Sequence, residues 1–228
     1  MVRGVWAGLF AGTAAFGQFF PISTPTVQYT SSTASVPIAV PDLTLIGSVT
    51  GGGQTVTFPA ALTAATVPSG WNFWGSPPNT ESSTPRVVFT DPTVTSVTLT
   101  LSAPANTFGF EVEPSNRGTT FPAPPTQYAI SATFLNGSTV LGTVTRAIPE
   151  DGALLEAASS VTPITSVVVT APLAAGGFAL AQFRFGNGII GAPSTAIPAL
   201  DTPALSALSM MLAATGALLA RSNSAVRA

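Results

Sequence analysis

Histidine, cysteine and lysine are all absent from the 228-residue chain. Without histidine there is no Ser-His-Asp or Cys-His catalysis and no imidazole metal ligand. The absence of cysteine excludes disulfides, thiolate zinc sites and thiol redox chemistry. The absence of lysine excludes Schiff-base catalysis and a phosphate-binding P-loop. We therefore expect no cofactor and no metal site.

Charge is also scarce, because Asp, Glu, Lys and Arg make up 7% of the chain, against about 25% in ordinary soluble proteins. The seven basic residues are all arginines, they are scattered, and the formal net charge is −2. This pattern gives no electrostatic footprint for nucleic acid. The 46% hydrophobic content is too high for a disordered chain and suits one core-forming domain with accessory segments.

The first residues have the pattern of a secretory signal peptide over residues 1–17. Arg3 supplies the positive start, and residues 5–16 form a short apolar run that is rich in small side chains. Ala15 and Gly17 stand at the −3 and −1 positions of a cleavage site before Gln18. The alternative is a buried N-terminal strand or helix.

The C-terminal end carries a second long apolar segment. Residues 204–220 contain no charge, Pro203 precedes them, and Arg221 follows. At about 1.5 Å per residue a helix here reaches roughly 25 Å, the short end of a membrane span. Arg221 and Arg227 favour a cytoplasmic C-terminus and an external body. The alternative is an amphipathic or buried helix.

This tail resembles the C-terminal sorting tails of bacterial surface proteins, of the IPTL-CTERM and PEP-CTERM type. The resemblance rests on the apolar run, on Arg221, and on the motif Ile197, Pro198, Ala199 and Leu200 within the linker 191–203. It implies an exported, envelope-held protein whose tail (204–228) contacts the membrane. An exosortase-type protease is the implied processing partner, and whether the tail is cut or kept stays open.

The body, residues 41–190, is predicted to be all-β, an antiparallel sandwich or jelly roll. Short strand-like runs separated by turn residues occur at 55–58, 86–90, 95–101, 107–113, 165–171 and 177–186. Asn136-Gly137 predicts a hairpin with a type I′ turn. Residues 18–40 are rich in Ser, Thr and Pro and are predicted to be a linker or an edge strand. Residues 149–152, "PEDG", indicate another turn.

The segments "GWNFWGSPPNTESSTPRVVFT", "NTFGFEVEP", "TVLGTVTR" and "FALAQFRFG" resemble a β-sandwich module of secreted bacterial proteins. No activity comes with this resemblance. Some relatives carry an acidic residue in the last strand that suggests a calcium site, but Leu180-Ala181-Gln182-Phe183 stands there. A calcium site at that position is therefore not expected.

The stretch "GWNFWG" offers a candidate glycan-binding surface. Trp71 and Trp74, with Asn79 and Arg86 nearby in sequence, have the residue types that bind sugars, since aromatic rings stack on sugar faces. The alternative is a loop packed over one end of the domain and stiffened by prolines. The spacing of the two tryptophans favours one buried and one partly exposed ring.

The acidic residues give only a weak indication of a catalytic site. Glu111 and Glu113 project from the same face of one strand, and we expect that face to be solvent-exposed, opposite Phe108, Phe110 and Val112. Carboxylates alone can hydrolyse glycosides, but such pairs normally face each other across a cleft. Arg86 and Arg184 are expected to form surface ion pairs with Glu81 or Glu156, worth about 0–1 kcal/mol.

The sequence thus predicts an exported, non-enzymatic cell-envelope protein with a structural or adhesive role. Envelope or matrix polysaccharide is its expected partner, since the body is poor in charge and rich in hydroxyl groups. The alternative is a carbohydrate-binding module that uses Trp71 and Trp74. A glycosidase that works with carboxylates alone is a third possibility.

Overall fold

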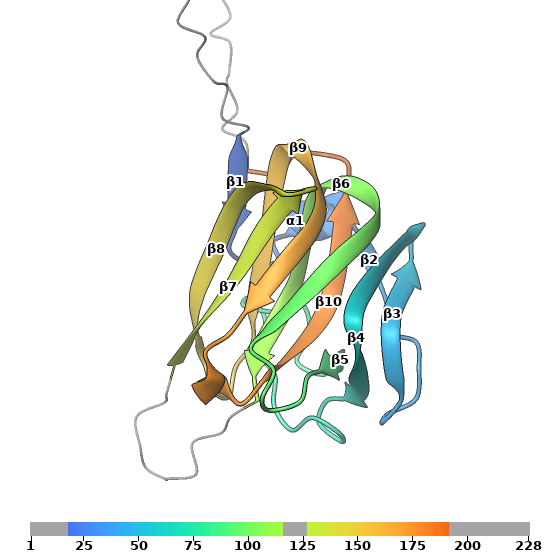
Figure 1. The fold of residues 1–228 in the computed structure, drawn as a ribbon, viewed down its shortest axis with the longest axis vertical. Helices are drawn as coiled ribbons and strands as arrows, with labels where there is room; N and C mark the ends of the chain where they lie inside the picture. Colours follow the sequence, from blue (N-terminus) through green and yellow to red (C-terminus); the bar gives the residue numbers. More distant parts are fainter. Residues whose placement is uncertain (1–17, 116–126, 192–228) are drawn as a thin grey trace, which may run out of the picture. The chain divides into compact units, whose positions relative to one another are not determined.

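The computed structural model describes residues 18–115 and 127–191. Within them the chain is all-β, as predicted, with one short helix and one 3-10 turn (Figure 1). The elements are β1 (Phe19–Ile22), α1 (Val27–Ser32), β2 (Ala34–Val36), β3 (Leu45–Gly51), β4 (Gln54–Thr66), β5 (Arg86–Phe89), β6 (Ser96–Pro114), β7 (Gln127–Asn136), β8 (Thr139–Pro149), β9 (Leu154–Thr170), η1 (Leu173–Ala175) and β10 (Phe178–Gly186).

All ten strands belong to one antiparallel sheet, which folds over into two β-sandwich-like layers. The long strands β6 and β9 take part in both layers. The first half of β6 pairs with the second half of β9, and its second half pairs with the first half of β9 and with β10. The register shifts between Thr100 and Thr107, where the ladder bends. The predicted strands 95–101 and 107–113 are therefore one continuous strand.

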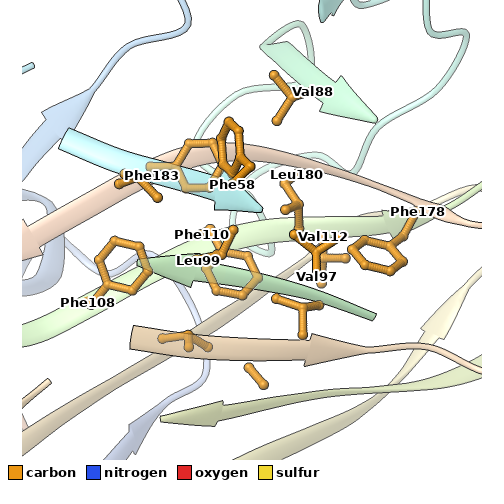
Figure 2. Packing of buried hydrophobic residues seen from close by; sticks show 14 of the residues in the cluster. Phe58, Val88, Val97, Leu99, Phe108, Phe110, Val112, Phe178, Leu180 and Phe183 are labelled. Atoms are coloured by element: carbon orange, nitrogen blue, oxygen red, sulfur yellow. The ribbon is translucent and has the colours of Figure 1, made fainter. Parts of the chain in front are cut away.

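The core lies between the two layers. Figure 2 shows the side chains of β4, β5, β6 and β10 that meet there, with Phe58, Phe110 and Phe183 among them. The ring of Phe183 lies 6.0 Å from that of Phe58 and 6.2 Å from that of Phe110, within the range of favourable aromatic pairs. Phe108, Phe110 and Val112 point into this core, as the alternation of β6 predicts.

A β-bulge in β10 decides which way its side chains point. Gln182 and Phe183 together oppose the single residue Phe110 of β6, and Gln182 has a φ of 53°. Strict alternation would place Phe183 on the face opposite Leu180. Because of the extra residue, the side chains of Leu180 and Phe183 both point into the core. Arg184 points to the outer face of the layer.

The hairpin between β7 and β8 is confirmed, but its turn differs from the prediction. Asn136 pairs with Thr139, so the two turn residues are Gly137 and Ser138. Gly137 has a φ of 56°, and Ser138 does not have a positive φ. A glycine at the first central position with positive φ there alone is typical of a type II′ turn, not of type I′. The turn at 149–152 is also present, with the Gly152 N–H bound to the Pro149 carbonyl.

The Ser/Thr/Pro-rich segment 18–40 contributes two strands and the helix to the fold. β1 pairs with β9, and β2 pairs with β10. Thr26 caps α1 by accepting a hydrogen bond from the Tyr29 N–H.

The predicted signal peptide and the sorting-tail residues Ile197, Pro198, Ala199, Leu200 and Arg221 lie outside the described residues. In the two ranges that the structure describes, no helix has the length and apolar character of a membrane span.

Candidate functional site

The outer face of the layer built on β6, β9 and β10 is lined by small residues. The side chains of Ala157, Ala179 and Ala181 point away from the core, beside Gly109 and the carboxylates of Glu111 and Glu113. Such side chains leave room above the strands. Two elements fill it: the loop from residue 67 to residue 85, and helix α1 with its buried Tyr29.

Trp74 is the central contact of the loop with this face. Its side chain is 6% exposed and packs with Ala153, Ala179 and Ala181. The indole Nε1–H donates a hydrogen bond of 2.8 Å to Oε2 of Glu111. The other oxygen of Glu111, Oε1, accepts the Glu81 backbone N–H at 2.5 Å. One buried carboxylate therefore holds the loop at two points.

Trp71 forms the second anchor. Its Nε1–H donates to Oε2 of Glu113, and its ring packs against Phe89 at 5.3 Å. Unlike Trp74, this ring is half-buried. It lines a shallow recess of about 250 Å³ together with Gly70, Asn72 and Ser115. The Ser115 hydroxyl is buried without a hydrogen-bond partner. One buried and one half-exposed indole is the arrangement that the spacing favours.

The expectation of a solvent-exposed face for Glu111 and Glu113 is wrong. Glu111 is 0% and Glu113 is 2% exposed, because the tryptophan loop covers them. Burial raises the pKa of Glu111 to about 7, although the hydrogen bonds from Trp74 and from the Glu81 N–H lower it. Both carboxylates lie on one strand and accept indole N–H groups, so in this arrangement they position the loop.

Arg184 and Glu81 form an ion pair, with 2.6 Å between Nε and Oε1. The pair was expected at the surface, but the side chains are only 17% and 11% exposed. Arg184 Nη1 also donates to the carbonyls of Thr30 and Thr33 at the end of α1. The pair thus ties the tryptophan loop and the helix to β10. The Tyr29 hydroxyl, on the same face, is buried without a partner.

Arg86 belongs to a different cluster. Its Nη2 lies 2.9 Å from Oδ1 of Asp42 and also donates to the Val40 carbonyl, and its Nη1 donates to the Thr66 hydroxyl at 2.8 Å. The prediction that Arg86 pairs with Glu81 or Glu156 is therefore wrong, because its partner is Asp42. Asn79 is exposed, in a turn that begins at Ser76. Trp71 and Arg86 line different recesses and Trp74 is buried, so the four predicted site residues do not line one recess.

The structure also contains a buried acid that the sequence analysis did not single out as an inward-facing group. Glu156 on β9 pairs with Phe110, so it points between the layers, and neither carboxylate oxygen has a hydrogen-bond partner. Burial raises its pKa to about 8, and the charge of Arg146 opposes this. Arg146 donates from Nη2 to the Ile22 carbonyl, and its Nε is buried without a partner. The continuous run "LLEAA" is the signal for a strand buried on both faces.

Among residues 18–115 and 127–191, no three acidic side chains gather as metal ligands.

No protein-family model matches the chain, and no curated protein matches it. Among solved structures, the chain is similar to CsCBM6-3 from Clostridium stercorarium, determined in complex with cellobiose. The TM-score is 0.27 and the identity 14%, over 45% of this chain and 75% of the other. A similarity this low does not extend the ligand of that protein to this chain.

Proposed function

We propose that the protein is an exported, non-enzymatic module that the C-terminal segment holds at the cell envelope, where it has a structural or adhesive role. The observation that supports the non-enzymatic part of this proposal is the role of Glu111 and Glu113 in the structure. Both are buried under the loop and accept indole N–H groups from Trp74 and Trp71. Carboxylates that accept these hydrogen bonds hold the loop in place. A glycosidase instead needs two carboxylates that are open to a cleft.

The envelope location rests on the sequence. The signal-like segment 1–17 accounts for export, and the apolar run 204–220 followed by Arg221 accounts for retention. The low charge of the body suits contact with an uncharged polysaccharide, because such a contact needs no ion pairs.

Fractionation of bacteria that export the full-length protein tests this proposal. We expect the full chain in the envelope fraction and a chain that lacks residues 198–228 in the medium. A variant with Asn79→Ala, an exposed change in the body, is the matched control and should stay in the envelope. Equal envelope retention of the truncated chain would contradict the role given to the tail.

A carbohydrate-binding module centred on Trp71 is the second candidate. The half-exposed indole, Asn72 and the unpartnered Ser115 hydroxyl line one recess, which combines a ring for stacking with hydrogen-bonding groups. Titration of the protein with neutral oligosaccharides should then change the fluorescence of Trp71. The change should disappear in Trp71→Phe and remain in Asn79→Ala. Equal responses of Trp71→Phe and the unaltered protein would exclude Trp71 as the contact.

A further inference from the structure

A second recess, of about 240 Å³, shares no lining residue with the recess beside Trp71. Its lining includes Ser35, Pro37, Pro85, Arg86, Gln182 and Phe183. These residues come from three strands and the segments beside them, so the recess is built by the fold and not by one loop.

The recess exists because two strands border the same edge of β10. β5 pairs with residues 179–181 of β10, and β2 pairs with residues 183–185. Gln182 falls between the two ladders and carries the positive φ of the bulge. The seam between β2 and β5 therefore places Gln182 in the lining of the recess, together with Arg86 at the start of β5. Bulges often re-aim a side chain at a binding site.

The recess carries no net charge once the ion pair between Arg86 and Asp42 is counted. The guanidinium of Arg86 is compensated by Asp42 at 2.9 Å, and the other lining residues carry no charge. The Arg86 side chain is 34% exposed and lines the recess, so part of it borders the open space. The Gln182 amide and the Ser35 hydroxyl supply further donors and acceptors, and Pro37 and Pro85 supply apolar surface.

We propose that this seam recess binds one sugar unit of a neutral polysaccharide. A pyranose ring combines an apolar face, for the prolines, with hydroxyl groups, for Arg86, Gln182 and Ser35. The volume is below the roughly 300–1,000 Å³ of sites for drug-sized ligands, which suits a single ring. An anionic sugar would bring its carboxylate close to Asp42, so a neutral polymer fits better. This inference rests on the adhesive form of the proposed function and gives it a site distinct from Trp71.

Gln182→Gly is the variant that tests the inference most cleanly. Glycine adopts a φ of 53° without strain, so the bulge should persist while the amide is lost. Arg86→Lys keeps a positive charge beside Asp42 but removes the planar guanidinium from the lining of the recess. Trp71→Ala, in the other recess, and Asn79→Ala, at an exposed turn, are the comparison variants.

Affinity electrophoresis of the full-length protein in mild detergent measures binding to the probes. These are hydroxyethylcellulose, laminarin, xylan and amylopectin as neutral polymers, and polygalacturonate as the anionic one. We expect at least one neutral polymer to retard the protein. Gln182→Gly and Arg86→Lys should each weaken that binding about tenfold, which corresponds to about 1.4 kcal/mol, with unchanged thermal unfolding for Gln182→Gly. Trp71→Ala and Asn79→Ala should bind as the unaltered protein does.

Three results would overturn the inference. If none of the neutral polymers retards the protein, the recess does not bind a neutral polysaccharide. The fractionation experiment tests the proposed envelope role separately, so that role does not depend on this result. Retardation that Trp71→Ala abolishes and Gln182→Gly leaves intact would move the site to the tryptophan loop. Retardation by polygalacturonate alone would show that the ligand is anionic.

Discussion

Glu156 predicts a specific dependence of stability on pH. The side chain is fully buried between the layers, neither oxygen has a hydrogen-bond partner, and its pKa is raised from 4.5 to about 8. Between these two values the folded protein keeps a proton that the unfolded chain releases. The folded state thus binds more protons than the unfolded state, and stability must fall as pH rises through this interval.

The magnitude follows from the width of the interval. One proton changes the free energy of unfolding by about 1.4 kcal/mol per pH unit, so Glu156 costs at most about 5 kcal/mol by pH 8. Glu111, with its pKa raised to about 7, acts in the same direction but only up to that pH. The charge of Arg146 is the one that faces Glu156 and reduces the effect.

Glu156→Gln should remove the first contribution, because an amide does not titrate. We expect the variant to be more stable than the unaltered protein at pH 8, by a few kcal/mol and within the limit of about 5 kcal/mol set by linkage. At pH 5 the two should be nearly equal. Urea unfolding at pH values from 5 to 9, followed by tryptophan fluorescence, measures both. Asp151→Asn, at an exposed turn, is the control and should leave the pH profile unchanged.

The reasoning would be refuted if Glu156→Gln kept the full pH dependence of the unaltered protein. The remaining slope of the variant should fall to about half near pH 7, where Glu111 is half titrated, and disappear roughly one pH unit above that. A slope in Glu156→Gln that keeps its full value through pH 8 would assign the buried proton to another group.

Three further changes test the packing of the outer face by chemical denaturation. Trp74→Phe should lower stability by roughly 2–4 kcal/mol, because it leaves Oε2 of buried Glu111 without its donor and opens a cavity; a loss below 0.5 kcal/mol would contradict this. Gly109→Ala should cost about 1–3 kcal/mol, since an added Cβ would clash with Ala157 and lie 2.6 Å from the Tyr29 hydroxyl; unchanged stability would show that the helix can move away. Tyr29→Phe should be neutral or stabilising, because it removes a buried hydroxyl that has no partner, and a marked loss would reveal a hidden partner.

The all-β class and most strands followed from the sequence because alternation and turn residues act locally. The pattern of Val97, Leu99 and Leu101, and the glycine at position 137, needed no tertiary information. The exact turn type did need it, because the pairing of Asn136 with Thr139 moves the turn by one residue. The path of segment 18–40 also depended on distant partners, since β1 and β2 form only against β9 and β10.

The candidate site was predictable only in part for the same reason. The two tryptophans could be singled out from composition, but not the carboxylates that they bind. Glu111 and Glu113 look like solvent-facing residues on an alternating strand. Their burial depends on a tertiary contact, because the tryptophan loop packs over Ala179 and Ala181 of β10 and covers both carboxylates. The short apolar residues on that face were the signal that it is covered, because a solvent-facing strand normally carries longer polar side chains.

The central claim is that the β6 carboxylates anchor the tryptophan loop and do not face a ligand. Hydrogen exchange at the indole Nε1–H of Trp74, followed by NMR, tests it most directly. We predict slow exchange, and a resonance that shifts as pH passes about 7, where Glu111 titrates. Glu111→Gln should abolish the pH-dependent shift. Exchange at the rate of an exposed indole, with no response to Glu111→Gln, would contradict the account and return Trp74 to the candidates for a ligand-binding surface.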